Sequence, residues 1–173
     1  EPTREPPDQV DARVPPVWRF ADVAVEPEAV LGEVGKGAEL LDAIRDRAAV
    51  GIAAEMLGSA TQAFETTLDY LKTRVQFGAV IGSFQALQHR AAELFGELQL
   101  ARSAVEEALT AIDEGSPALP GLASLAKAIA GETVHQISSQ MVQLHGGIGM
   151  THEHDAGLYL KRARVAGQCY GST

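Results

Sequence analysis

A cation, two amides and an aromatic residue stand close together where the longest helical pattern of the chain ends. Arg74, Gln76, Phe77 and Gly78 fall within five residues, and Gln85 follows on the first turn of the next helix. A guanidinium offers a planar fork of donors for phosphate oxygens, an aromatic ring can cover a flat heterocycle, and glycine lets a ligand approach the backbone. Taken alone, the same residues also fit an arginine that complements a helix dipole and a phenylalanine of the core.

A second cluster of polar and glycine residues stands where a later helical pattern stops. Gln143 and His145 are followed by Gly146, Gly147 and Gly149. Glycines leave backbone amides open to a ligand, but the segment follows a helix rather than a strand, so it is not a dinucleotide fingerprint. Taken by itself, this cluster is most simply interpreted as a helix stop.

The composition predicts a folded domain and excludes several function classes. The 173 residues are 46% apolar and 21% charged, as in a globular domain with a core. A formal charge of -9 argues against a nucleic-acid partner, and no apolar run approaches the ~18–20 residues that span a bilayer. The single cysteine excludes an intrachain disulfide, which fits a reducing, cytoplasmic location. The chain does not begin with Met, and we expect it to be part of a longer protein.

The first 36 residues differ from the rest and predict the end of a β domain. Five of the eight prolines lie in the first 16 residues, where we expect extended or loop structure. Alternating bulky residues in 17–25 predict one or two short strands. Because two strands alone are marginal in water, we expect the rest of their sheet to lie outside this chain. We therefore assign 1–36 to a β domain and 37–173 to a helical domain.

Residues 37–173 carry the pattern of an antiparallel four-helix bundle of long helices, so the predicted fold class is mainly α with a short β remnant. Apolar residues recur every three or four positions over about 38–75, 84–112, 120–145 and, more briefly, 152–168. Ser83 and Thr151 are the expected N-caps of the second and fourth helices. The third helix is rich in small residues, which lets its neighbours approach closely, and its expected inward positions are Ala126, Ala130, Val134, Ile137, Met141 and Leu144.

The two corners together resemble the acyl-CoA dehydrogenase family. Arg-x-Gln-Phe-Gly-x-x-Ile-Gly-x-x-Gln at 74–85 and Gln-x-His-Gly-Gly-x-Gly-x-Thr-x-Glu at 143–153 are similar to motifs of that family's C-terminal helical domain. The resemblance covers about 17–171. It implies an FAD flavoprotein that removes two hydrogens, α and β to the thioester of an acyl-CoA, and that assembles as a dimer of dimers through the helical bundle.

The resemblance also implies roles for individual residues. Arg74, Gln76 and Phe77 would face the flavin of a neighbouring subunit, with Gln85 nearby. The adenylate half of that FAD would lie along Gln143, Gly146 and Gly147.

The chain departs from the family where the catalytic base is expected. The usual glutamate, on the segment after the fourth helix, matches Tyr170 here, and the alternative position on the first long helix matches Ala48. An arginine that helps to position the acyl-CoA in many members matches Ala49, whereas Asp46 matches an acidic position near the substrate. A phenol with an ordinary pKa of about 10 is a poor base for abstracting an α proton. Because Tyr170 occupies the usual glutamate position, we assign no catalytic residue in this chain.

Three hypotheses follow. The first is a subunit, or a fragment of one, that helps to hold FAD but lacks the base, in a homo- or hetero-oligomer beside a chain that owns the glutamate. The second is an active homomer that uses another base, with Asp46 as the acid to test. The third is a helical interaction module without flavin, which the heptad seam over 84–112 fits equally well. No metal site is expected, because His152, His154 and Asp155 are interpreted as a polar helix start.

Overall fold

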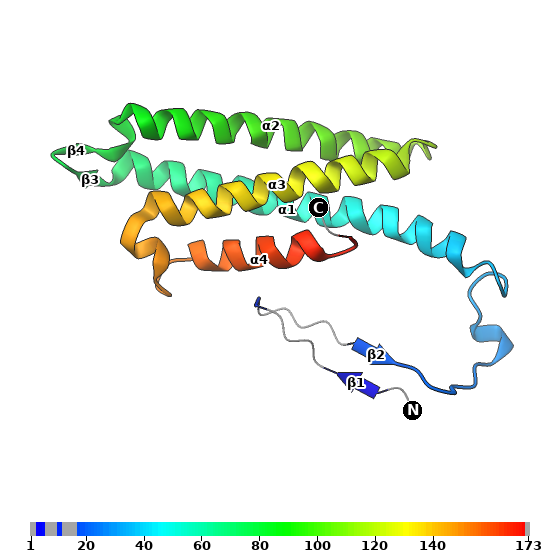
Figure 1. Cartoon of the computed structure of the whole chain (residues 1–173). Coiled ribbons are helices and arrows are strands. Elements are labelled where there is room, and N and C mark those ends of the chain that lie inside the picture. Colours follow the sequence, from blue (N-terminus) through cyan, green and yellow to red (C-terminus); the bar gives the residue numbers. More distant parts are fainter. Residues whose placement is uncertain (1–2, 6–9, 12–16, 172–173) are drawn as a thin grey trace.

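Four helices form an antiparallel bundle, as the sequence predicts (Figure 1). The computed structural model describes residues 3–5, 10–11 and 17–171. The long helices are α1 (Gly37–Thr73), α2 (Gln85–Asp113) and α3 (Leu119–His145), and the shorter α4 is Ala156–Gln168. Helix α3 packs more extensively against the other three helices than any of them does, so it is the central element of the bundle. No helix within the described ranges is long and apolar enough to cross a membrane.

The core is built on the small residues of α3. All six inward positions predicted for this helix are buried. Alanines at 126 and 130 let α1 and α2 come close, and larger side chains such as Ile137 and Met141 fill the space nearer the other end. The alternation of small and large residues therefore sets how closely the helices pack.

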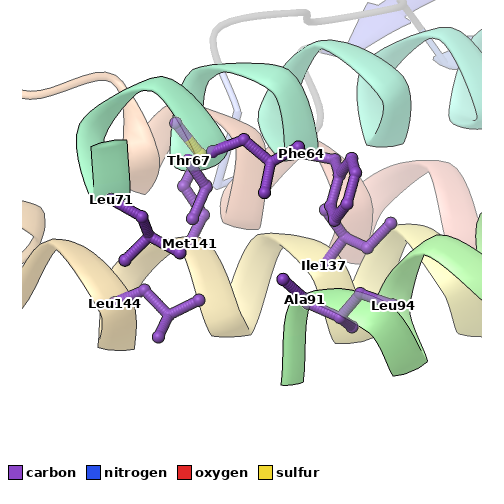
Figure 2. A pocket seen from close by; sticks show the side chains of 9 residues that line it. Phe64, Thr67, Leu71, Ala91, Leu94, Ile137, Met141 and Leu144 are labelled. Atoms are coloured by element: carbon purple, nitrogen blue, oxygen red, sulfur yellow. The ribbon is translucent and has the colours of Figure 1, made fainter. Parts of the chain in front are cut away.

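A small void lies where α1, α2 and α3 meet, and it is lined by apolar side chains and Thr67 (Figure 2). Phe64 and Leu71 come from α1, Ala91 and Leu94 from α2, and Met141 from α3. Its volume of about 10 Å³ is close to that of one water-sized sphere, so it is a packing defect rather than a ligand site.

The apolar stripe predicted for α1 is buried over only part of its length. Ile52, Met56 and Phe64 lie in the core, but Leu41 is 60% exposed and Ile44 is 49% exposed. The apolar residues do lie on a helix, as their spacing predicts. The N-terminal end of α1, however, extends beyond the elements of the described chain that could cover it (Figure 1).

The two predicted N-caps are wrong. Helix α2 begins after Phe84, and the Ser83 hydroxyl donates to the carbonyl of Val80 at 2.7 Å. Helix α4 begins after Asp155, and the Thr151 hydroxyl donates to the carbonyl of Ile148 at 2.8 Å. Each hydroxyl donates its hydrogen bond within the preceding 3-10 turn. Neither side chain therefore caps the helix that follows.

One short strand forms within 17–25, as the alternation predicts. This strand, β2 (Val17–Arg19), pairs antiparallel with β1 (Thr3–Glu5), which lies in the part expected to be extended or loop. Arg162 of α4 donates to Glu55 at 2.7 Å and to Asp11 at 2.9 Å, which links two helices and the N-terminal segment. The hydrogen bond to Glu55, followed by that to Asp11, holds the pKa of Arg162 above its usual range.

Candidate functional site

A tight hairpin that the sequence did not predict presents the first corner. Helix α1 ends at Thr73, and β3 (Val75–Gln76) pairs with β4 (Ala79–Val80) across Phe77 and Gly78. Both turn residues have positive φ, 55° and 78°, which is the backbone of a type I′ hairpin turn. The hairpin is tied back to the helix end by a 2.8 Å hydrogen bond from the Ile81 amide to the Arg74 carbonyl.

Phe77 is held in a conformation and an environment that folding alone does not favour. Positive φ suits Asn or Gly in such a turn, and a bulky residue there costs roughly 1–3 kcal/mol. The Phe77 side chain is 92% exposed, and its ring meets that of Phe84 edge-on at 6.3 Å. A strained, exposed aromatic residue at a hairpin tip is suited to contact a ligand or a second chain.

The two corners identified in the sequence meet in one pocket of about 310 Å³. Six of the seven predicted cofactor residues line it, and the exception is Gln85, which begins α2 outside the lining. The pocket also contains side chains that the sequence analysis missed. The lining consists of Tyr70, Arg74, Gln76, Phe77, Ile81, Phe84, Leu87, Arg90, Gln143, Leu144, His145, Gly146 and Gly147.

The charge of this pocket is opposite to that of the chain. Arg74 and Arg90 line it, and none of the lining residues is acidic, although the chain carries a formal charge of -9. Arg90 also reaches Gln140 of α3 at 3.4 Å. Two guanidinium groups beside amide and backbone donors form a site suited to an anionic ligand.

Glycines open the second corner. Helix α3 ends at His145, and Gly146 follows with φ 64°, a left-handed value that favours glycine. A Cβ placed on Gly146 or Gly147 would meet no atom within 4 Å, so both residues face open space. Gly149 differs, because its Cβ would lie 2.6 Å from the Val142 carbonyl oxygen, and only glycine fits there. Close packing therefore requires glycine at position 149, whereas the space beside Gly147 is open and could admit a ligand.

His145 is a buried wall of the pocket. Its Nδ1 donates to the Met141 carbonyl at 2.7 Å, and Nε2 is buried without a partner among the described residues. The ring packs between Tyr70 and His154 at centroid distances of 4.3 and 4.2 Å, and the Tyr70 hydroxyl donates to the His145 carbonyl at 3.3 Å. Burial is the main cause that lowers the pKa of His145. The hydrogen bond to Met141 raises this pKa, and the nearby His154 lowers it.

We expect His145 to make stability depend on pH. Since the pKa is lower in the folded state, the unfolded chain takes up the proton first as the pH falls below about 6.5. The free energy of unfolding should therefore be steady above that pH and fall below it, by at most ~1.4 kcal/mol per pH unit for this one group. Urea unfolding between pH 7.5 and 5.0 measures this slope.

The matched variants for this slope are His145→Asn and His152→Asn. His152 is exposed, so H152N should keep the slope of the wild type, whereas H145N should flatten it. Equal slopes for H145N and the wild type would show that another group causes the pH dependence.

A second pocket, of about 230 Å³, contains the residues considered for catalysis and substrate binding. Asp46 and Ala49 of α1 line it together with Tyr170, which has φ 57°, whereas Ala48 is not part of the lining. The other side is formed by α3, which contributes the buried Lys127. The structure thus brings Asp46 and Tyr170 to one place, although they are far apart in the sequence.

The charged lining residues of the two pockets that the sequence analysis missed are Arg45, Arg90 and Lys127. Lys127 had a visible signal, because it lies four residues after Ala123 and three before Ala130, on the inward stripe of α3. Arg90 had none, since it lies on an exposed part of α2 and joins the pocket only through the packing of α2 on α3.

The segment 152–155 is a turn rather than a helix start. His154 accepts a 3.1 Å hydrogen bond from the Ala156 amide and stacks on His145. Within the residues described, no three His, Cys, Asp or Glu side chains are grouped as a metal site would require.

Comparison with known proteins agrees with this arrangement. A family model described as acyl-CoA dehydrogenase, C-terminal domain, matches residues 35–173. The acyl-CoA dehydrogenase IpdE2 of Mycolicibacterium smegmatis is 42% identical over 128 residues, which are 74% of this chain and 39% of that protein. The short-chain specific acyl-CoA dehydrogenase of Megasphaera elsdenii is 32% identical over 154 residues, 89% of this chain and 40% of that protein.

A solved structure gives the same result. Butyryl-CoA dehydrogenase from Megasphaera elsdenii superimposes with a TM-score of 0.92 at 29% identity, covering 98% of this chain and 44% of that one. This chain therefore spans about two fifths of the length of the relatives it matches. The bundle, its two corners and these similarities lead to one conclusion: the chain belongs to the acyl-CoA dehydrogenase family and corresponds to its C-terminal helical domain.

Proposed function

We propose that this chain is the helical part of an FAD-dependent acyl-CoA dehydrogenase and that it contributes flavin contacts without supplying a catalytic base. The observation that carries the proposal is the pocket of the two corners, which gathers Arg74, Gln76, Phe77, Gln143 and the glycines in a positively charged lining. Such a lining fits an anionic dinucleotide that also has a flat ring system.

The lining of this pocket supports FAD as the proposed ligand. Arg74 and Arg90 match the phosphates, Phe77 offers an uncovered aromatic face, and Gly146 and Gly147 leave space for close approach. In this assignment Gln76 and Gln143 orient the ligand through their amides. Bound FAD would supply the acceptor for the hydride that leaves the β carbon of the thioester.

The distance between the two pockets supports a flavin that is shared between subunits. Asp46 and Arg74 are separated by 28 positions along α1, which is about 42 Å at ~1.5 Å per residue. One flavin ring cannot contact both pockets of the same chain. We therefore propose that the corner pocket serves the active site of a neighbouring subunit, whereas the Asp46 pocket faces a flavin held by other parts of the protein.

The absence of a carboxylate at two positions underlies the claim that no base is supplied. Tyr170 and Ala48 stand where a base is expected from the family, and a phenol is a poor base near neutral pH. A second candidate is an active homomer in which Asp46 abstracts the proton, and the position of Asp46 in the same pocket as Tyr170 favours testing it. If Asp46→Asn left turnover unchanged in an active assembly, this second candidate would be rejected.

The partners follow from the same proposal. The substrate would be an acyl-CoA thioester, and the assembly would be a homo- or hetero-oligomer, organised as a dimer of dimers through the bundle. Exposed Leu41 and Ile44 at one end of α1 fit a helix whose cover comes from other chains or domains. Residues 1–36, with exposed Trp18 and Phe20, would be the end of a preceding β domain.

Phe77 provides the sharpest test of the flavin contact, because stability and binding should change in opposite directions. In Phe77→Asn the type I′ turn gains a residue that tolerates positive φ, so we expect about 1 kcal/mol more stability. The same change removes the aromatic face, so the assembled full-length protein should retain less FAD after gel filtration. Thermal unfolding and the flavin absorbance per chain measure the two effects.

Arg74 tests the charged part of the site. Arg74→Met removes charge-assisted hydrogen bonds of ~1.5–3 kcal/mol, so the Kd for FAD should rise by about tenfold or more. Arg102→Met, an exposed arginine of α2 outside the pocket lining, is the matched control and should bind as the wild type does. Equal Kd values for R74M and R102M, or an assembly that never carries flavin, would contradict the proposed function.

A further inference from the structure

Lys127 is a buried lysine that ties the end of α4 to the segment after it. The residue is 6% exposed, and its Nζ donates hydrogen bonds of 2.9 Å to the carbonyls of Gly167 and Gly171. None of the ion pairs found among the described residues includes Lys127. Burial lowers the pKa of its ammonium, and the two carbonyls accept hydrogen bonds from it.

The carbonyls that Lys127 binds lie on both sides of a sharp bend. Gly167 is in the last turn of α4, where carbonyls lack helical partners and a cation is favoured. Beyond the helix, Tyr170 has φ 57° and Gly171 has φ 119°. A tyrosine rarely occupies the left-handed region, and such a residue persists only where surrounding contacts fix it. The paired hydrogen bonds from Lys127 are contacts of that kind.

The bend also determines where the side chain of residue 170 lies. Tyr170, Asp46 and Lys127 line the same pocket, and Tyr170 is 57% exposed on its surface. A lysine reaching across from α3 therefore couples the central helix of the bundle to the position at which the base is expected.

We infer that Lys127 is a positioning residue: its bonds to Gly167 and Gly171 fix the left-handed bend that presents residue 170 to the pocket shared with Asp46. The inference rests on the proposed function only in assigning that pocket to the thioester. The clamp itself is a property of this fold and applies whichever side chain stands at 170.

The clamp is tested by amide hydrogen exchange of the full protein in which the chain occurs. Lys127→Met keeps an unbranched side chain as far as Cε and removes the Nζ donors, so amides of residues 168–171 should exchange at least about tenfold faster, whereas those of α1 stay protected. Lys127→Arg keeps a donor and should restore most of the protection. Lys161→Met, a half-buried lysine of α4 with no hydrogen bond or ion pair among the described residues, is the control and should exchange as the wild type does. If K127M loses helix content, Lys127→Gln, which keeps one donor group, is compared with the same control.

A second measurement separates this inference from the proposed function. In an assembly that carries Tyr170→Glu, K127M should lower kcat by about tenfold or more while KM changes little, because the base is displaced and the thioester still binds. Unchanged exchange of residues 168–171 in K127M, or in K127Q where that variant is used, would overturn the clamp. Faster exchange with no activity for any residue at 170 would support the clamp and count against the proposed function.

Discussion

Replacing Met141 with Ala is expected to lower the free energy of unfolding by about 3–5 kcal/mol. Met141 is 0% exposed, and it lines the small void between α1, α2 and α3 (Figure 2). Truncation removes the transfer free energy of a large side chain and joins the new space to the existing void, so the bundle loses contacts on three helices at once. The midpoint of urea unfolding, followed by far-UV circular dichroism, measures the loss.

Met150→Ala is the matched control for this effect. Met150 is 78% exposed, so the same chemical change should alter stability by less than ~0.5 kcal/mol. Similar midpoints for M141A and M150A would mean that the junction of the three helices does not stabilise the fold as described.

Replacing Tyr170 with Glu is expected to raise acyl-CoA turnover at the pocket of this chain by about 100-fold or more. A positioned general base contributes roughly 10²–10⁴ to rate, and a glutamate is ordinarily ionised at neutral pH and able to accept a proton, whereas a phenol is still protonated there. Residue 170 already lies in the pocket with Asp46, so the change supplies a base where the structure has room for one. Steady-state dehydrogenation by the assembled flavoprotein measures the gain.

Tyr170→Gln separates the base from the shape of the side chain. Glutamine is isosteric with glutamate but cannot accept a proton at this pH, so Y170Q should remain as inactive as the unmodified pocket. If Y170E and Y170Q were equally inactive in a flavin-loaded assembly, more than a base would be missing from this pocket. Full activity of the unmodified chain by itself would contradict the claim that it supplies no base.

The helices and the inward face of α3 could be predicted because they depend on local periodicity. Ile137 and Met141, for example, recur at helical spacing and are buried as expected. The pocket joins the corners at Arg74 and Gln143 because α1 and α3 run in the same direction and end at the same end of the bundle (Figure 1).

What could not be predicted depends on interactions between distant residues or on competing local bonds. Ser83 and Thr151 have the residue types of N-caps, but their hydroxyls donate to carbonyls three residues earlier. Phe77 adopts positive φ, a conformation that phenylalanine rarely takes, so its residue type did not indicate the hairpin turn. The clamp by Lys127 joins residues at least 40 positions apart, and no local pattern carries that information.

The most direct test of the central claim is a native mass spectrum of the assembly, purified from its own source, with the flavin content determined on the same sample. If this chain holds flavin for a neighbouring subunit but supplies no base, the spectrum should show a heteromer with a glutamate-bearing partner and fewer flavins than chains. An active homomer with as many flavins as chains would contradict the account, and it would move the search for the base to Asp46.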